Sequence, residues 1–191
     1  MDAAVLAGGR GSRMNFRDKS QLTYRGNTFL NTIVTTLRKF NRILIISNRD
    51  KTTFPDIHMN VYKDIISDIG PLGGIYTALK NAASQQIFVT SCDMPLIKEE
   101  HIDTICAYSE YDIVIPVYKG KYEMLFALYS KNCLPQIEKL IGEKQYKLTG
   151  LFEDKGLKVK KVPVDQKFIA SLKNINTEQD YSVLTENIHK K

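Results

Sequence analysis

Several features are missing from this sequence, and each absence argues against a class of protein. No apolar run approaches the roughly 20 residues of a membrane-spanning helix. The N-terminal MDAAVLAGGR turns glycine-rich before a signal-peptide hydrophobic region could form. The chain has only three cysteines, and their wide spacing without a CxxC pair argues against a disulfide framework or a structural zinc site. We therefore expect a cytoplasmic protein that does not enter a membrane.

Residues for covalent catalysis are also missing as a set. The three histidines, His58, His101 and His189, stand alone, without the spacing of a zinc site or a catalytic dyad. Cys92 lies beside Asp93 but has no base visible in the sequence, so it is interpreted as a packing residue. These absences favour chemistry that needs no protein nucleophile.

The composition that remains is that of an ordinary globular protein. The 191 residues are 43% hydrophobic and 25% charged, and they suit one α/β domain with its own core. The net charge of +6 is spread along the chain and does not form a basic stripe with interleaved aromatics. A solvated basic surface and a nucleotide-phosphate pocket both fit this charge, and nucleic-acid binding is not favoured.

Strand-like and helix-like segments alternate along the chain. Short apolar, β-branched runs typical of strands lie at residues 2–6, 42–47, 59–64, 86–91, 112–117, 122–129 and 157–162. Helical spacing follows Asn27 or Thr28, Pro71, Ile97 and Asn132, recurs briefly at 147–154, and follows Thr177 with Asp180 three residues on. Pro116 predicts an interrupted or edge strand. The alternation predicts an α/β fold with a doubly wound, mostly parallel sheet.

No linker rich in Pro, Gly or Ser divides the chain, which predicts a single domain over residues 1–191. In open α/β sheets, ligands bind beyond the carboxyl ends of the strands. The loops at those ends are therefore where candidate site residues are expected.

The loop after the first strand reads LAGGRGSRMNFRDK over residues 6–19. Its glycines allow the backbone to approach a ligand and to aim N–H groups at phosphate oxygens. Positive charge comes from Arg10, Arg13, Arg17 and Lys19. The loop lacks a Walker A pattern and the third glycine of the dinucleotide fingerprint. It predicts a triphosphate cradle, and a glycine-rich turn with incidental arginines is the alternative.

Carboxylates follow two other strands. Asp93, in CDMP after the strand at 86–91, could hold Mg²⁺, which is commonly bound by one or two protein carboxylates plus substrate phosphates. Its alternative role is to cap the turn before Pro95. Asp64 precedes the GPLGG turn at 70–74, and Asp68 competes with it for any role.

The segment NINT at 174–177 precedes the last helix. Its amide oxygens could complete a metal shell, and capping of the helix by Thr177 is the alternative interpretation.

Five motifs occur in an order that resembles a known family. They are LAGGxxxRM…DK at 6–19, GPLGGI at 70–75, CDMP at 92–95, LFALY at 125–129 and NINT at 174–177. Together they resemble the molybdenum cofactor guanylyltransferase family, within the wider sugar-nucleotide and pyrophosphorylase-like nucleotidyltransferases. The resemblance covers nearly the whole chain. It implies a Rossmann-like nucleotidyltransferase fold of the GT-A type, with an antiparallel strand in the second half.

The resemblance also implies roles for individual residues. Lys19, Arg13 and Asp93 would act in catalysis, and Asp93 with Asn176 would hold Mg²⁺. GTP would be contacted by Leu6, Ala7, Gly8, Gly9, Lys19, Asn48, Asp64 and Asp93. Residues 1–95 would bind the nucleotide, and residues 96–191 would bind the acceptor. Asn15 stands where many relatives have glycine, and Glu178-Gln179 replaces the usual Pro-Glu.

The implied reaction transfers GMP from GTP to the phosphate of molybdopterin and releases pyrophosphate, with Mg²⁺ as cofactor. The implied state is a monomer in transient contact with cofactor-pathway proteins or apo-molybdoenzymes. Two alternatives remain: a related nucleotidyltransferase that uses CTP or a sugar-phosphate acceptor, and a non-catalytic nucleotide-binding protein on the same fold.

Overall fold

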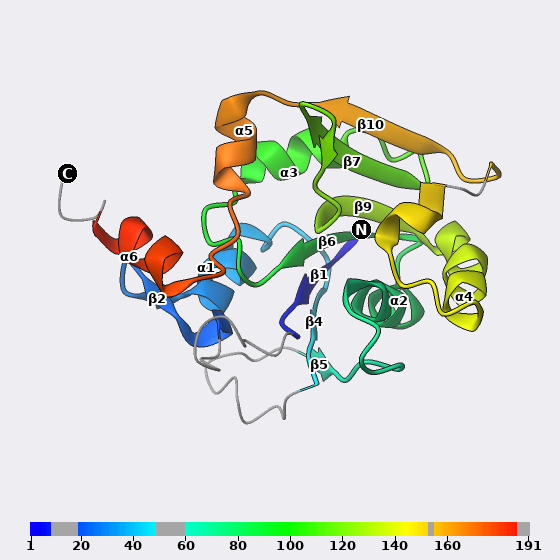
Figure 1. The fold of residues 1–191 in the computed structure, drawn as a ribbon, viewed down its shortest axis with the longest axis horizontal. Coiled ribbons are helices and arrows are strands. Elements are labelled where there is room, and N and C mark those ends of the chain that lie inside the picture. Colours follow the sequence, from blue (N-terminus) through cyan, green and yellow to red (C-terminus); the bar gives the residue numbers. More distant parts are fainter. Residues whose placement is uncertain (9–18, 49–59, 153–154, 187–191) are drawn as a thin grey trace.

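A computed structural model describes residues 1–8, 19–48, 60–152 and 155–186 (Figure 1). Its strands are β1 (Asp2–Leu6), β2 (Thr23–Tyr24), β3 (Asn27–Thr28), β4 (Ile43–Ile46), β5 (Asn60–Tyr62), β6 (Gln86–Ser91), β7 (Ile113–Tyr118), β8 (Lys121–Tyr122), β9 (Phe126–Ser130) and β10 (Val159–Pro163). Its α-helices are α1 (Phe29–Thr36), α2 (Pro71–Asn81), α3 (Glu99–Cys106), α4 (Leu134–Gly142), α5 (Gln166–Ser171) and α6 (Glu178–Glu186). Three short 3₁₀ helices within the described ranges are η2 (Lys19–Gln21), η4 (Lys131–Cys133) and η5 (Leu148–Phe152).

The strands form one mixed sheet in the order β10-β7-β9-β6-β1-β4-β5, with β8 paired to β7. Strand β1 pairs in parallel with β4 on one side and with β6 on the other. Strand β9 lies antiparallel between β6 and β7, and β10 is parallel to β7. The expected fold is confirmed: a single α/β domain has a parallel core and antiparallel pairing in its second half.

Helices cover both faces of the sheet (Figure 1). The alternate residues Ala3 and Val5 of β1 face a core cluster that includes side chains of α1, α3 and α5. Ala4 and Leu6 face a second cluster built with α2 and α4. This alternation follows from the two-residue period of a strand. The sheet is therefore doubly wound, as the continuous apolar run at 2–6 predicts.

Three capping signals in the sequence act as expected. Thr28 caps α1 by accepting a hydrogen bond from the Asn31 N–H at 3.1 Å. Pro71 lies in the first turn of α2, where no intrahelical donor is needed. Thr177 and Asp180 form a reciprocal box at α6, because each side chain accepts from the other residue's backbone N–H at 3.1 Å. Within the described ranges, no helix is long and apolar enough to cross a bilayer.

The prediction that Pro116 marks an edge or an interruption is wrong. β7 is continuous and lies between β9 and β10. The Ile113 N–H points to β10, where it donates to the Lys158 carbonyl at 3.1 Å, so by alternation the missing N–H of Pro116 faces the β9 side. Pairing with β9 ends at Val114, so the proline removes no ladder bond there.

Other boundaries also differ from expectation. The strand expected at 122–129 divides into β8 and β9. The helical segment expected at the Asn132 cap begins two residues earlier, because the Ser130 side chain accepts from the Asn132 N–H at 3.2 Å and caps η4. The hairpin of β2 and β3 and the six-residue helix α5 were not predicted. Both are too short for hydrophobic periodicity to identify them.

One glycine of the GPLGG turn allows a close approach to the backbone. A Cβ added at Gly73 would lie 2.8 Å from the Ile66 carbonyl oxygen and 2.8 Å from Ile69 Cγ1. At Gly142, at the end of α4, an added Cβ would meet nothing within 4 Å.

We predict that Gly73→Ala lowers the free energy of unfolding by about 1–3 kcal/mol, as overpacking does. The matched Gly142→Ala should leave it unchanged or raise it by up to about 1 kcal/mol, because alanine favours helix. Chemical denaturation of both variants measures this difference. Equal stabilities for the two variants would contradict the packing of Gly73 on Ile66.

Candidate functional site

A cavity opens at the carboxyl ends of the central strands. Its volume is about 1200 Å³, which is large enough for a nucleotide. Its lining combines the ends of β1, β4 and β6 with the segment before α2: Leu6, Gly8, Ile46, Asn48, Lys63, Asp64, Ser67, Asp68, Gly70, Pro71, Gly74, Ser91 and Leu125. This is the edge of the sheet at which an open α/β fold is expected to bind its ligand.

The end of β1 directs the chain into this cavity. The Ala7 N–H donates to the Ile46 carbonyl at 2.8 Å, and the Leu6 carbonyl accepts from the Cys92 N–H at 3.1 Å. Gly8 is the first exposed residue, and a Cβ placed on it would lie 3.9 Å from Asp64 Oδ2. Of the residues expected to contact the nucleotide, Leu6 and Gly8 therefore line the cavity, whereas Ala7 between them is buried in the core cluster on the other face of the sheet.

Asn48 and Asp64 form a two-bond pair across the ends of β4 and β5. Asn48 Nδ2 donates to Asp64 Oδ2 at 2.9 Å, and the Asp64 N–H donates to Asn48 Oδ1 at 3.0 Å. This arrangement fixes the carboxyl plane and uses one of the two carboxyl oxygens. The fold thus brings together Asn48 and Asp64, which were selected separately from the sequence. Asp68 lines the same cavity.

The other carboxyl oxygen of Asp64 has an unusual environment. Among the described residues, Asp64 Oδ1 is a buried side-chain oxygen without a hydrogen-bond partner. Burial raises the pKa of Asp64, and the hydrogen bond from Asn48 offsets only part of this rise. A buried acceptor without a partner costs free energy. It therefore favours a ligand that donates a hydrogen bond at this point.

Asp93 follows the end of β6 by two residues and contacts the cavity lining through Ser91. Ser91, a cavity-lining residue, donates its hydroxyl to Asp93 Oδ1 at 2.6 Å. The Asp93 carbonyl accepts from the Ile175 N–H at 2.9 Å, so the NINT segment runs against Asp93. The segment at 174–177 and the CDMP segment at 92–95, far apart in the sequence, therefore meet at the backbone of Asp93.

Glu123 is a second acidic group near Asp93, and the sequence gave no reason to select it. Glu123 precedes β9, which pairs with β6 up to Thr90 and Phe126, and it lies close enough to Asp93 for their charges to interact. Burial raises the pKa of Glu123, and the negative charge of Asp93 raises it further. The Leu125 N–H donates to Glu123 Oε1 at 3.2 Å. Ser91 is placed by the pairing of β6 with β1, and Glu123 by the pairing of β6 with β9, so neither could be recognised before the sheet was known.

The donor groups at Asp93 fit one kind of metal ion. The described residues contain no group of three or more His, Cys, Asp or Glu that could hold a metal by themselves. Asp93 is half-buried, and Asn176 follows Ile175, whose N–H bonds to Asp93. One carboxylate and an amide oxygen suit Mg²⁺, which keeps waters and takes phosphate oxygens as its other ligands. The chemistry fits a magnesium ion that arrives with a triphosphate.

Three predicted residues are not placed. Gly9 and Arg13 lie outside the described residues, and so does the side chain of Lys19, whose backbone begins η2.

Comparison with known proteins identifies the family. The model of the MobA-like NTP transferase domain matches residues 3–159. The chain belongs to this family. It is therefore a nucleotidyltransferase.

Curated relatives match almost end to end. A probable molybdenum cofactor guanylyltransferase of Clostridium perfringens is 35% identical over 188 residues, covering 95% of this chain and 94% of the relative. The protein of the same name from Carboxydothermus hydrogenoformans is 32% identical, with 96% and 94% covered. The crystal structure of molybdopterin-guanine dinucleotide biosynthesis protein A from Archaeoglobus fulgidus has a TM-score of 0.83 at 24% identity and covers all of both chains, which shows the same fold.

The unpartnered oxygen of Asp64 leads to a prediction about stability in this MobA-like chain. A carboxyl group with a raised pKa binds its proton more readily in the folded state, so its contribution is unfavourable once pH exceeds that pKa. Stability from this group falls as pH rises from its ordinary value of 3.8 through the raised pKa, and then stays constant.

We predict that Asp64→Asn is more stable than the native chain at pH 7, by roughly 0.5 kcal/mol after allowance for the solvent that screens a half-buried group. The gain should vanish at pH values below 3.8. Thermal unfolding measured across this pH range checks the difference. A variant that is less stable at pH 7 would show that the Asp64 charge is compensated.

Proposed function

We propose that this chain transfers GMP from GTP to the terminal phosphate of molybdopterin. An oxygen of the acceptor phosphate attacks the α-phosphorus of GTP, a new P–O bond forms, and the bond to the β-phosphate breaks to release pyrophosphate. No protein nucleophile is needed, which agrees with the isolated histidines. The names of the curated relatives support both the donor and the acceptor.

The observation that carries the choice of base is the unpartnered Oδ1 of Asp64, in a carboxyl group held by Asn48. Guanine presents two adjacent donors, its N1–H and its 2-amino group, and a carboxylate is the natural acceptor for such a pair. Cytosine and adenine present one amino donor beside a bare ring nitrogen, which repels a carboxylate. A site built to accept from a donor pair rejects bases that lack it.

The proposed roles of the remaining residues follow the cavity from end to end. Backbone N–H groups of Gly8 and Gly9, with Arg13 and Lys19, would neutralise the triphosphate, and Asp93 with Asn176 would hold Mg²⁺. When bound, the ion supplies positive charge next to the transferred phosphate. Ser91 orients Asp93 through its 2.6 Å hydrogen bond. Catalysis then consists of alignment and charge neutralisation.

The broader setting belongs to the same proposal. Residues 1–95 form the nucleotide-binding half, and residues 96–191 form the acceptor-binding half. The protein acts in the cytoplasm as a monomer, and it makes transient contact with cofactor-pathway proteins or apo-molybdoenzymes to pass on its product.

The first test is turnover. Pyrophosphate release is measured with each of the four NTPs, Mg²⁺ and molybdopterin, for the native chain, Asp93→Ala and the control Asp103→Ala. Asp103 is a surface residue of α3 with 69% of its side chain exposed. We expect GTP-selective release that falls by about 100-fold or more in Asp93→Ala, as for loss of a charge-stabilising group. The control should change it less than about twofold, since surface substitutions are usually close to neutral. Selectivity for CTP would contradict GTP as the donor but would leave nucleotidyl transfer as the reaction.

A second test addresses the base directly. Asp64→Asn and Asp68→Asn each remove one negative charge from the lining of the same cavity. Loss of the acceptor at Asp64 should weaken GTP binding by about tenfold or more, the effect of one lost charged hydrogen bond, while Asp68→Asn stays within about threefold. Titration calorimetry with GTP and CTP measures both. Equal losses in the two variants would mean that Asp64 acts only through its charge.

A further inference from the structure

The segment that crosses Asp93 runs from the end of α5 to the start of α6, and its Ile175 N–H donates to the Asp93 carbonyl at 2.9 Å. Ile175 is only 2% exposed and packs with Leu22, Phe29 and Leu184 in a small separate cluster. Asn176 follows directly. The position of Asn176 relative to Asp93 therefore depends on how Ile175 is seated, and on the contacts that hold the segment on either side of it.

The end of the segment that leads to α6 is fixed by Asp180. Its carboxylate accepts from the Asn176 N–H at 3.2 Å, and it pairs with Lys173 Nζ at 3.0 Å. The hydrogen bond from the Thr177 side chain, with the one from Lys173, lowers the pKa of Asp180 to about 2. Asp180 therefore remains charged at neutral pH and keeps its contacts with Asn176 and Lys173.

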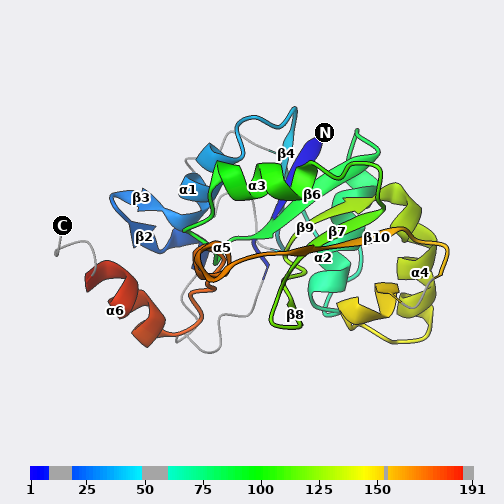
Figure 2. The ribbon, with the colours of Figure 1, turned by 90° about the horizontal axis from the view of Figure 1, so that it is seen from above.

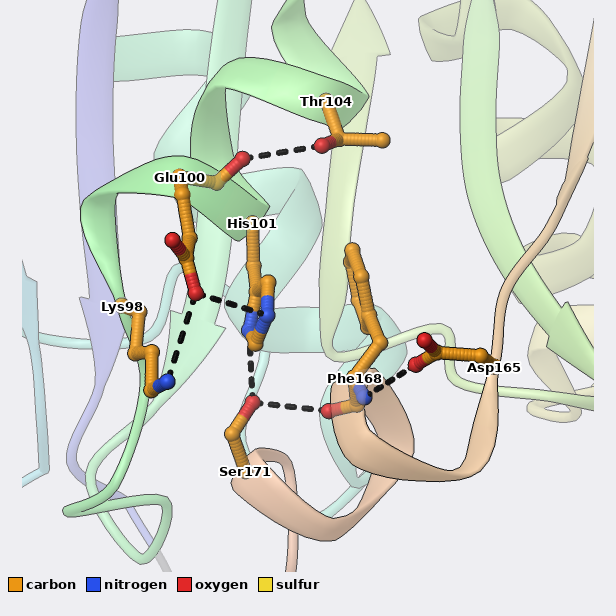
Figure 3. A network of polar contacts seen from close by, with 7 residues as sticks. All are labelled: Lys98, Glu100, His101, Thr104, Asp165, Phe168 and Ser171. Atoms are coloured by element: carbon orange, nitrogen blue, oxygen red, sulfur yellow. Dashed lines mark hydrogen bonds and ion pairs between the residues drawn. The ribbon is translucent and has the colours of Figure 1, made fainter.

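The other end is fixed by a buried contact between α5 and α3, shown in Figure 3. Ser171, the last residue of α5, lies 2.7 Å from His101 Nδ1, and both side chains are 7% exposed. The His101 ring also stacks on Phe168 with centroids 4.1 Å apart. This polar contact is the point at which the segment leaves the helical layer.

The directions of the hydrogen bonds define its chemistry. The Ser171 hydroxyl donates its only proton to the Phe168 carbonyl at 2.7 Å, so its oxygen must accept from His101 Nδ1–H. His101 Nε2 faces Glu100 at 3.5 Å. Serine, histidine and glutamate thus occur together, but the serine proton points away from the imidazole. This arrangement does not activate a nucleophile.

The same contact is insensitive to protonation. Burial lowers the pKa of His101, opposed by the charges of Glu100 and Asp165 and assisted by those of Lys98 and Lys167. Neutral His101 keeps its proton on Nδ1, and protonation adds one on Nε2 beside Glu100. The bond to Ser171 survives both states, so it is a permanent anchor.

We infer that His101 and Ser171 are positioning residues: their buried hydrogen bond anchors the segment 172–177 against Asp93 and so holds Asn176 at the phosphate-transfer site. The inference rests on the proposed function for its catalytic consequence. The anchoring of the segment by this hydrogen bond does not depend on the proposed function, and it can be tested without any substrate.

The variants His101→Phe and Ser171→Ala each remove the bond. The first keeps an aromatic ring over Phe168, and the second leaves α3 untouched. His101→Asn restores a donor close to the place of Nδ1. Glu100→Gln is the matched control, because it removes a charge beside Nε2 and its exposed ion pair with Lys98 but leaves the bond from Nδ1 to Ser171; the Glu100 side chain is 64% exposed.

The first readout is hydrogen–deuterium exchange of the intact, substrate-free chain. Exchange of the Ile175 amide should become about tenfold faster in His101→Phe and Ser171→Ala, corresponding to about 1.4 kcal/mol of lost local stability. Amides of β1 and β6 should be unaffected. His101→Asn and Glu100→Gln should resemble the native chain. Unchanged exchange at Ile175 in both bond-deleting variants overturns the anchor, whatever the protein's activity.

The second readout is turnover of GTP as a function of Mg²⁺ concentration. Both bond-deleting variants should lower kcat by about tenfold and raise the Mg²⁺ concentration for half-maximal rate by at least about threefold, as a small misplacement of a site group does. KM for GTP should stay constant, because the base contacts lie at Asp64. Faster exchange at Ile175 with native kcat and native Mg²⁺ dependence would refute the positioning role. A native chain with no turnover at all would instead reject the proposed function.

Discussion

The burial of β1 between β4 and β6 is the constraint on which the rest of the molecule depends. All five residues of β1 are buried, and the strand is hydrogen-bonded along both edges. The small side chains of Ala3 and Ala4 let helices pack on either face. Because β1 pairs in parallel with both neighbours, its loop and those after β4 and β6 emerge at one edge. The cavity with Asn48, Asp64 and Ser91 at its lining follows from this arrangement.

The segment between α5 and α6 contacts Asp93 from outside the sheet. α6 lies away from the sheet, at one end of the molecule (Figure 2). The Tyr181 hydroxyl donates to the Thr23 carbonyl at 2.8 Å, which ties α6 to the hairpin of β2 and β3. Ile175 packs with Leu22 in the same small cluster while its N–H bonds to Asp93. Ile175 therefore contacts both Leu22, which follows the glycine-rich loop in the sequence, and Asp93, which follows β6.

Sequence patterns predicted the sheet, the alternation of strands with helices and most helix starts, because those features depend on local periodicity and capping. Asp64 and Asp68 could not be separated by local signals, and both line the cavity. What distinguishes Asp64 is its bond to Asn48, a contact between two strands that no local pattern encodes. Ser91 and Glu123 were missed for the same reason, since the pairing of β6 with β1 places Ser91 and its pairing with β9 places Glu123.

The corrections show the limit of local rules from the other direction. Pro116 removes no ladder hydrogen bond, although its strand β7 is not at the edge of the sheet. The reason is that the pairing of β7 with β9 ends at Val114. Ser130 and Asn132 are both good cap residues, and the strand that ends at Ser130 decided between them. The contact of His101 with Ser171 joins residues 70 positions apart through a helix too short to predict.

In the proposed function, one cavity holds guanine at Asp64 and the reacting phosphate beside Asp93. A crystal structure of the chain with Mg²⁺ and a GTP analogue that carries a methylene group between the α- and β-phosphorus atoms tests this most directly. We expect the guanine N1–H and 2-amino groups on the Asp64 carboxylate and the α-phosphate beside Asp93. A base bound elsewhere, with Asp64 Oδ1 still unpartnered, would contradict it.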